Sequence, residues 1–136
     1  MSDNPRGIIQ GFLDAIGRGE PLEEMTTPDM KAWTVNAGDT PKEKFFGGCK
    51  LLAVIFDGSL RYTIDELTLQ DDRAVAEVRS HGTTIKGEEF NNVHVFIFRL
   101  EEGKVASVAE FMNQQAVSET IVPLMQEVMS LSLIHI

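Results

Sequence analysis

The segment FNNVHVFIFRLEEGKV, residues 90–105, decides the fold class of this chain. Through its first part, apolar residues alternate with other residues, and this two-residue period is typical of a β-strand. The triplet Glu101-Glu102-Gly103 then interrupts the pattern, and a second strand-like segment follows it. A turn this short joins antiparallel neighbours. The segment therefore predicts a hairpin whose strands are residues 89–100 and 104–113.

The rest of the chain supplies two more strands directly before this hairpin and helices at both ends. Apolar residues at helical spacing, with glycines or proline at the ends, mark three helices. Helix followed by strand, helix and a four-strand meander predicts an α+β fold rather than a doubly wound parallel sheet. The expected elements are a helix from Pro5 to about residue 16, a short helical turn at 22–25, strand 31–36, helix 41–56, strands 60–69, 73–82, 89–100 and 104–113, and a final helix 117–129 that is kinked or restarted at Pro123.

The second helix carries two local signals. Thr40-Pro41-Lys42-Glu43 has the form of a capping box with proline at the first helical position, which predicts the helix start. Gly47-Gly48 lies inside the same helix and costs about 1 kcal/mol per glycine relative to alanine. Such a cost indicates close packing or a bend at this point.

Composition excludes several classes of function. The 136 residues suit one domain, and 21 acidic against 12 basic residues give a formal net charge of −9, which disfavours nucleic acid and anionic membrane surfaces. The single Cys49 cannot form an internal disulfide. Residues 1–6 lack a signal-peptide layout and no apolar run reaches the length of a membrane span. We therefore expect a cytoplasmic protein without a metal site, because no metal-ligand spacing is present, and without a cofactor.

The last six residues, LSLIHI at 131–136, match one reading frame of a common sequencing adapter. We interpret them as a non-native tail on a gene fragment of metagenomic origin, with a natural apolar tail as the alternative. The expected domain is therefore residues 1–130.

Four segments together resemble the nuclear-transport-factor-2-like (NTF2-like) superfamily, in particular its SnoaL-like polyketide cyclases, ketosteroid isomerases and limonene-epoxide hydrolases. They are IGRGE at 16–20, WTVNAG at 33–38, the hairpin at 90–105 and AEFMN at 109–113. The resemblance implies a cone-shaped, curved antiparallel sheet wrapped around helices and enclosing a cavity. It also implies a homodimer through the outer sheet face, where Val93, Val95 and Ile97 would lie. The same scaffold hosts enzymes and non-enzymes.

The resemblance also assigns faces to the strands. It places Asn92, His94, Phe96 and Phe98 inward, with Val108, Glu110 and Met112 beside them. On the preceding strand it places Glu77, Arg79 and His81 inward, and Ala74, Ala76, Val78 and Ser80 outward.

Glu110 is the expected acid/base residue, because a carboxylate in an apolar cavity suits proton transfer. Arg79 or His94 would pair with it, and Glu77 completes the set of catalytic candidates. Glu77, Arg79 and Glu110 fall where the epoxide hydrolases carry an Arg, an Asp and a second Asp, so their mechanism does not transfer directly. The alternatives are a structural ion pair for Glu110, a solvent-facing Glu77 and Arg79, and a core histidine for His94.

The expected substrate-binding residues are mostly apolar. Asn92 would bond a substrate carbonyl or else tie down the neighbouring turn, and Trp33 would line the cavity or pack the first strand. The only tyrosine, Tyr62, is not expected at the oxyanion position of the isomerases, and Cys49 is expected to be buried and inert. The full set of expected binding residues is Trp33, Asn92, Phe96, Met112 and Phe56.

These expectations lead to one function and one alternative. The leading function is a cofactor-free isomerase, cyclase or hydrolase that acts on a small hydrophobic organic ligand through Glu110. The alternative is a non-catalytic binding or dimerisation domain of the same fold.

Overall fold

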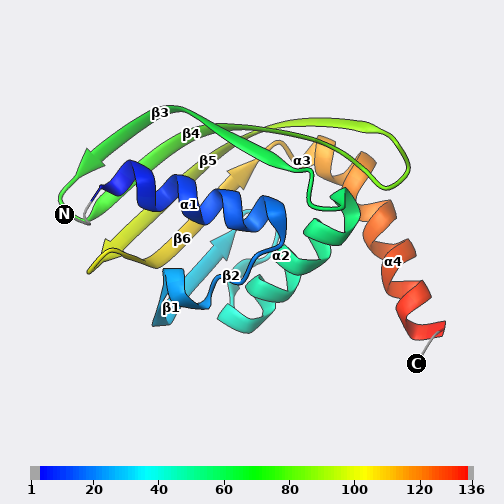
Figure 1. Cartoon of the computed structure of the whole chain (residues 1–136), viewed down its shortest axis with the longest axis horizontal. Helices are drawn as coiled ribbons and strands as arrows, with labels where there is room; N and C mark the ends of the chain where they lie inside the picture. The colour runs from blue at the N-terminus through cyan, green and yellow to red at the C-terminus, as the bar shows by residue number, and fades with distance from the viewer. Residues whose placement is uncertain (1–3, 135–136) are drawn as a thin grey trace.

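The computed structural model describes residues 4–134 and shows one curved sheet with helices on its concave side (Figure 1). The sheet has six strands in the order β2-β1-β6-β5-β4-β3. The elements are α1 (Pro5–Arg18), the 3₁₀ turn η1 (Glu23–Met25), β1 (Thr26–Thr34), β2 (Gly38–Thr40), α2 (Lys42–Phe56), β3 (Arg61–Gln70), β4 (Arg73–Thr83), β5 (Glu89–Glu101), β6 (Lys104–Met112), α3 (Gln114–Ala116), the π-helical turn η2 (Val117–Ile121) and α4 (Val122–Ile134).

The predicted α+β class and the final hairpin are confirmed. β5 and β6 pair antiparallel, with Glu101 opposite Lys104 across the turn. The expectation of a wholly antiparallel sheet is wrong at one place, because β1 pairs parallel with β6. No hairpin turn joins these two strands, which lie far apart in the sequence, so chain connection does not force them to run in opposite directions. The sheet is mixed.

α1 begins and ends where its sequence predicts. The Asn4 side chain accepts a hydrogen bond from the Gly7 amide, and Pro5 takes the first helical position. The helix ends at Gly19, whose φ of 75° is the left-handed conformation that glycine adopts without strain. Between these ends, one face of α1 is buried against the sheet.

The predicted start of α2 is correct to within one residue, but the capping box is not formed and the glycines are not closely packed. The helix is preceded by Pro41 and has no side-chain cap, because the Thr40 hydroxyl donates instead to the Gly38 carbonyl in β2. Gly47 and Gly48 are exposed, and a methyl group added to either would meet no atom within 4 Å. Close packing therefore does not explain these glycines.

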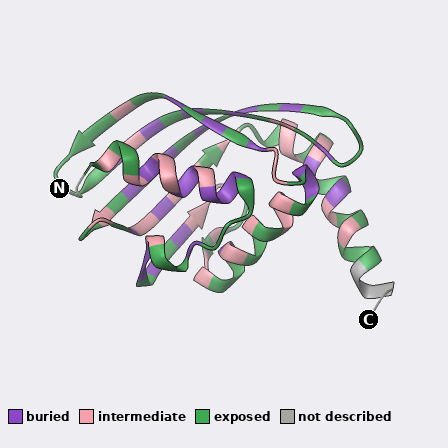
Figure 2. Cartoon of the chain, in the orientation of Figure 1, coloured by how far each residue is buried: buried purple, intermediate pink, exposed green. Residues whose placement is uncertain are grey.

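The two faces of β4 are the reverse of the prediction. The small residues at 74, 76, 78 and 80 are buried on the inner face, whereas Glu77, Arg79 and His81 are exposed on the outer face. Figure 2 shows this alternation of buried and exposed residues along the strands. The inner face of β4 packs into the same buried core as α1, and this tight packing accommodates small side chains. The charged side chains of the strand lie on the outer face.

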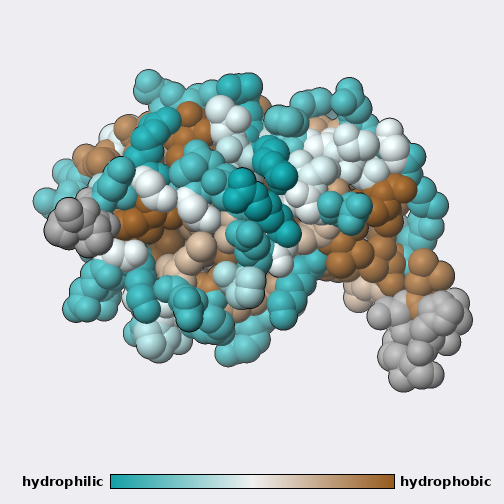
Figure 3. All heavy atoms as spheres, in the orientation of Figure 1, coloured by the Kyte–Doolittle hydropathy of each residue, from teal (hydrophilic) through white to brown (hydrophobic). Residues whose placement is uncertain are grey.

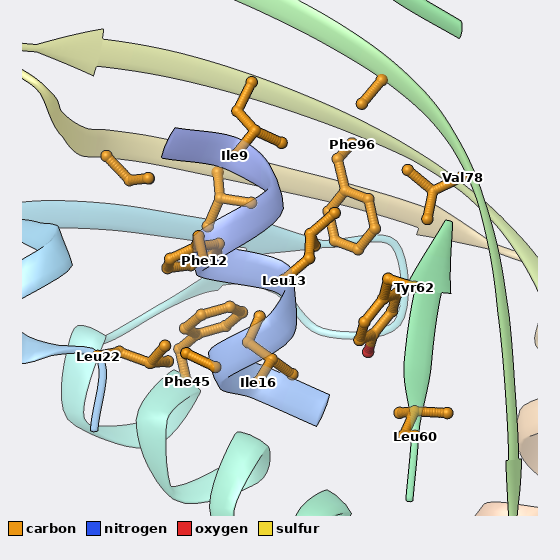
Figure 4. Packing of buried hydrophobic residues seen from close by; sticks show 14 of the residues in the cluster. Ile9, Phe12, Leu13, Ile16, Leu22, Phe45, Leu60, Tyr62, Val78 and Phe96 are labelled. Atoms are coloured by element: carbon orange, nitrogen blue, oxygen red, sulfur yellow. The ribbon is translucent and has the colours of Figure 1, made fainter. Parts of the chain in front are cut away.

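The core fills one end of the concave side of the sheet with aromatic rings in contact with one another. Phe12 of α1 meets Phe98 of β5 edge-on with ring centroids 5.8 Å apart, and Phe98 stacks on Phe96 at 5.7 Å. Figure 4 shows Leu13 and Ile16 of α1 facing Phe96 and Tyr62, with Phe12 on the other side of the helix. Because side chains fill this end, a ligand cavity has room only toward the other end of the strands.

The C-terminal helices lie at that other end. The predicted helix with an interruption at Pro123 is confirmed, since the π-helical turn η2 directly precedes α4. Proline has no amide hydrogen to donate, which favours such an irregularity. An ion pair between Lys86 and Glu127, 2.8 Å long, joins α4 to the loop between β4 and β5.

The proposed tail at 131–136 lies partly outside the described residues, and its origin stays a prediction. Within residues 4–134, no helix has both the length and the apolar character to cross a membrane.

Candidate functional site

The site is a cavity of about 300 Å³ between the inner sheet face, α2 and the C-terminal helices. Its walls are mostly apolar side chains, among them Ile16, Phe45, Leu52, Leu60 and Phe90. Val117 and Ile121 of η2 and Met125 of α4 close one side. This volume is at the lower end of the range for small-molecule sites.

Polar side chains enter this apolar cavity in a row across adjacent strands. The register places Tyr62 of β3 directly opposite Ser80 of β4. Glu110 of β6 is opposite Thr34 of β1 and diagonal to His94 of β5. All five side chains line the cavity. The sheet therefore holds the polar groups in one rigid array, and none of them depends on a loop for its position.

Glu110 and His94 form the central pair. His94 Nδ1 lies 2.9 Å from Glu110 Oε2, and the two side chains are 6% and 17% exposed. The structure thus places Glu110 in the cavity with His94 in hydrogen-bond reach, as the sequence predicts for their positions. Their catalytic role stays a prediction.

Ser80 contacts the other ring nitrogen of His94. Its Oγ lies 2.7 Å from Nε2, and the residue is buried. An ionised Glu110 oxygen only accepts hydrogen bonds, so Nδ1 then carries the imidazole hydrogen and Nε2 accepts from the Ser80 hydroxyl. Both ring nitrogens of His94 are therefore satisfied by side chains from the neighbouring strands.

Arg79 and Glu77 are not in the site, and the prediction that they face the cavity is wrong. Arg79 lies on the outer face and forms a bidentate ion pair with Asp65 of β3, with Nε–Oδ2 and Nη2–Oδ1 distances of 2.8 Å. The Arg79 guanidinium lowers the pKa of the Asp65 carboxyl through this hydrogen bonding. Glu77 is exposed on the same face. Glu110 consequently has His94, and not Arg79, as its partner.

Two of the predicted binding residues lie elsewhere. Trp33 is on the outer sheet face, where its ring contacts Phe111 with centroids 4.9 Å apart, because its neighbour Thr34 takes the inward position. Phe56 is fully buried against Phe90, at 5.3 Å, and does not line the cavity.

The other three predicted binding residues do line the cavity: Asn92, Phe96 and Met112. The Asn92 side chain is engaged locally, since its Nδ2 donates to the Asn113 carbonyl and its Oδ1 accepts from the Val93 amide. Asn92 therefore faces the cavity and also ties down the end of β6, and its bond to a substrate carbonyl stays a prediction.

Sequence reasoning missed Tyr62 and Ser80. Tyr62 packs its ring edge-on against His94, with centroids 5.6 Å apart. Burial raises the pKa of the Tyr62 hydroxyl well above its ordinary value, and the charge of Glu110 raises it further. The signal for Tyr62 was present in the alternation of Leu60, Tyr62 and Ile64, which places all three on one face.

Cys49 also lines the cavity and is partly buried. Burial raises the pKa of its thiol to about 12, and the charge of Glu110 contributes to the shift. The thiol is therefore protonated at neutral pH, in keeping with the expectation of an inert cysteine. Among the described residues, no three His, Cys, Asp or Glu side chains gather into a cluster suited to a metal ion.

No protein-family model matches the sequence, and no curated protein sequence matches it. Solved structures do match the fold. An NTF2-like protein from Anabaena variabilis superposes with a TM-score of 0.70 at 20% identity, over 80% of this chain and 86% of its own. The chain adopts the NTF2-like fold.

Two further NTF2-like structures are described as candidate polyketide cyclases. A SnoaL-like one from Jannaschia sp. CCS1 has a TM-score of 0.70 at 18% identity, covering 85% of this chain and 90% of its own. IdmH from Streptomyces antibioticus has a TM-score of 0.73 at 16% identity, covering 87% of this chain and 98% of its own. At these identities the likeness shows the NTF2-like fold alone.

Proposed function

We propose that the protein is a cofactor-free enzyme of the cyclase or isomerase type, which moves protons on a small, largely apolar molecule held in the cavity. The observation that carries this proposal is the Glu110–His94 pair, with its 2.9 Å contact, inside a cavity whose walls are mostly apolar. The two structural neighbours described as candidate polyketide cyclases support the same class.

Glu110 is the proposed acid/base group. His94 engages its Oε2 atom, whereas Oε1 makes no hydrogen bond to any side chain or backbone group of the described residues. Oε1 is thus available to take a proton from a substrate carbon and return it to another atom. His94 holds the carboxylate in one orientation, which lowers the entropic cost of reaching the reactive geometry.

Tyr62 is the proposed donor to the oxygen on which negative charge develops when the substrate loses its proton. A tyrosine hydroxyl is protonated at neutral pH and can donate a hydrogen bond, and burial raises the pKa of Tyr62 further. A fixed donor in a cavity of low polarity stabilises an enolate oxygen more strongly than water does.

The position of Arg79 helps to decide between proton transfer and water addition as the reaction type. A water-adding hydrolase mechanism of the kind implied by the epoxide-hydrolase resemblance needs a cation beside the inward carboxylate. Arg79 is instead bound to Asp65 on the outer face. We therefore favour proton transfer over water addition.

The test is hydrogen exchange into a panel of small apolar ketones and 1,3-diketones in D₂O, followed by mass spectrometry. Glu110→Gln keeps the shape of the side chain but cannot accept the proton, so exchange should fall by roughly 10²–10⁴-fold. Binding of the same ketones, followed by ligand-observed NMR, should persist. Arg79→Gln is the matched control on the outer face and should exchange at the wild-type rate.

A non-catalytic binding module is the second candidate, favoured by the largely apolar lining of the cavity. Ketones that bind the wild-type protein without any exchange above the buffer rate would reject the enzyme and support this module.

A further inference from the structure

The proposed proton transfer uses Glu110 and leaves one contact of His94 without a chemical role. Ser80, His94 and Glu110 lie on three adjacent strands and are bonded in series, with Ser80 Oγ–His94 Nε2 at 2.7 Å and His94 Nδ1–Glu110 Oε2 at 2.9 Å. All three side chains line the cavity. A serine bonded to Nε2 of a histidine, whose Nδ1 is bonded to a carboxylate, is the arrangement that activates a nucleophilic serine.

The protonation logic of the series suits an attacking serine. With Nδ1–H donated to the Glu110 carboxylate, Nε2 presents its lone pair to the Ser80 hydroxyl and is placed to take its proton. The imidazolium that would form is stabilised by the adjacent carboxylate. Glu110 and Ser80 also hold the ring from both sides, which fixes its orientation.

Hydrogen-bond donors flank Ser80 on both neighbouring strands. The register pairs Ser80 directly with Tyr62 on β3 and with Asn92 on β5, and both of these side chains line the cavity. Directly paired residues have Cβ atoms about 4.5–5.5 Å apart. Tyr62 offers its hydroxyl hydrogen, and Asn92 Nδ2 offers the hydrogen that it does not donate to Asn113. An oxyanion formed at Ser80 would therefore lie between two donors.

We propose that Ser80 is a nucleophile that accepts an acyl group from small apolar esters, with His94 as its base and Glu110 as the carboxylate that orients His94. Ser80 Oγ forms a bond to the ester carbonyl carbon while its proton passes to His94 Nε2. The bond from that carbon to the alcohol oxygen then breaks, and the departing oxygen takes the proton from Nε2. Water next attacks the acyl group, gives its proton to Nε2, and releases the acid as that proton returns to Ser80 Oγ.

The cavity limits the substrate class. A volume of about 300 Å³ with mostly apolar walls fits a short, uncharged acyl chain. Glu110 disfavours an acyl chain that carries its own negative charge, because like charges repel strongly where water is excluded. Esters of neutral short-chain acids are therefore the expected substrates.

The experiment uses the wild-type protein with p-nitrophenyl butyrate and, separately, with phenylmethylsulfonyl fluoride. We expect a burst of up to one p-nitrophenolate per chain and a single sulfonyl adduct that peptide mass spectrometry maps to Ser80. Ser80→Ala and His94→Gln should each lower the rate of p-nitrophenolate release by roughly 10³-fold or more. His81→Gln is the matched control, since His81 is exposed on the outer face.

Two results would overturn this inference. One is the absence of a Ser80 adduct under conditions that fully label a serine protease in the same tube. The other is equal p-nitrophenolate release from the wild-type protein and from His94→Gln. The adduct is read on the wild-type chain, so misfolding of a variant does not affect the first of these two results. If the wild-type protein exchanges ketone hydrogens but forms no Ser80 adduct, only the Ser80 nucleophile is rejected. If it forms the Ser80 adduct but exchanges no ketone hydrogens, only the proposed proton transfer is rejected.

Discussion

At the scale of single residues, Cys49 and Glu110 share the cavity, and the charge of one affects the other. Burial is the main reason that the pKa of the Cys49 thiol rises to about 12, and the Glu110 carboxylate is the second. Cys49 is the only cysteine in the chain, so its chemical reactivity can be measured without interference. It therefore serves as a built-in reporter of the charge on Glu110.

We expect iodoacetamide to modify Cys49 at pH 8 at least roughly 100-fold more slowly in the folded protein than in urea, because the thiolate is the reactive form. Glu110→Gln removes one cause of the raised pKa and should accelerate the folded-state reaction. The exposed substitution Glu119→Gln is the control. Equal rates for Glu110→Gln and the wild-type protein would show that Glu110 carries no charge that reaches Cys49.

The same shift predicts how stability depends on pH. An unfolded thiol has a pKa of about 8.5, so between that pH and about 12 the unfolded chain binds fewer protons than the folded one. The free energy of unfolding should therefore fall with rising pH, by up to about 1.4 kcal/mol per pH unit from this group. Urea unfolding between pH 8 and pH 10 measures it. Cys49→Ala should flatten this fall, and an identical pH slope for Cys49→Ala and the wild type would contradict the prediction.

The sequence predicted the position of Glu110 and His94 but not that of Ser80, for a physical reason. Alternation along β4 separates two sets of residues without saying which set faces inward. The prediction placed Glu77 and Arg79 inward because charged residues suit a catalytic cavity, and it placed the small residues outward because they suit a dimer interface. Packing against the buried core decides the question, and it is a tertiary effect that period-two patterns do not contain.

At the scale of elements, helices and the hairpin could be predicted because their periodicity and their end signals agree. β2 was not predicted, and β1 was predicted too short, since it begins at Thr26 and the sequence indicated residue 31. Pro28 lies inside this strand, in the part where the pairing with β6 is irregular between Thr26 and Lys31. Proline lacks an amide hydrogen and is tolerated in strands at such irregular points. Because proline normally argues against a strand, the sequence did not indicate the first half of β1.

α1 offers a test of packing with two glycines on one helix. A Cβ at Gly17 would lie 2.1 Å from the Leu60 carbonyl oxygen, whereas one at Gly11 would meet nothing within 4 Å. Gly17→Ala should therefore destabilise the protein by about 1–3 kcal/mol or more through overpacking. Gly11→Ala should stabilise it by about 0.5–1 kcal/mol through higher helix propensity. Urea unfolding measures both, and effects of the same sign would contradict the packing of α1 against Leu60.

At the scale of the whole molecule, several apolar side chains remain exposed, among them residues of α4 and of the outer sheet face. Figure 3 shows hydrophobic surface over α4. The outer sheet face carries Val93, Val95 and Phe111, which are 57%, 37% and 40% exposed, with Trp33 packed beside Phe111. An exposed apolar group of this kind marks an interaction surface more often than chance. We propose that the outer face forms a homodimer.

Sedimentation velocity at micromolar concentration should show a dimer for the wild-type protein. Val93→Glu places a charge in the centre of the proposed interface, so this variant should sediment as a monomer. Glu20→Gln is the control, because Glu20 is exposed at the end of α1 on the opposite side of the sheet, and this variant should remain a dimer. A wild-type monomer at these concentrations would reject the outer-face interface.

The parallel pairing of β1 with β6 has a consequence for synthesis of the chain. β1 leaves the ribosome long before β6, its partner on one side, and pairs with β2 alone until Lys104–Met112 have been made. During this interval one edge of β1 has unpaired amide and carbonyl groups, which are a site for aggregation. Contacts between such distant segments also slow folding. Nascent chains that end before residue 104 should therefore occupy holdase chaperones, and release should coincide with the emergence of β6, the strand that brings Glu110 to His94.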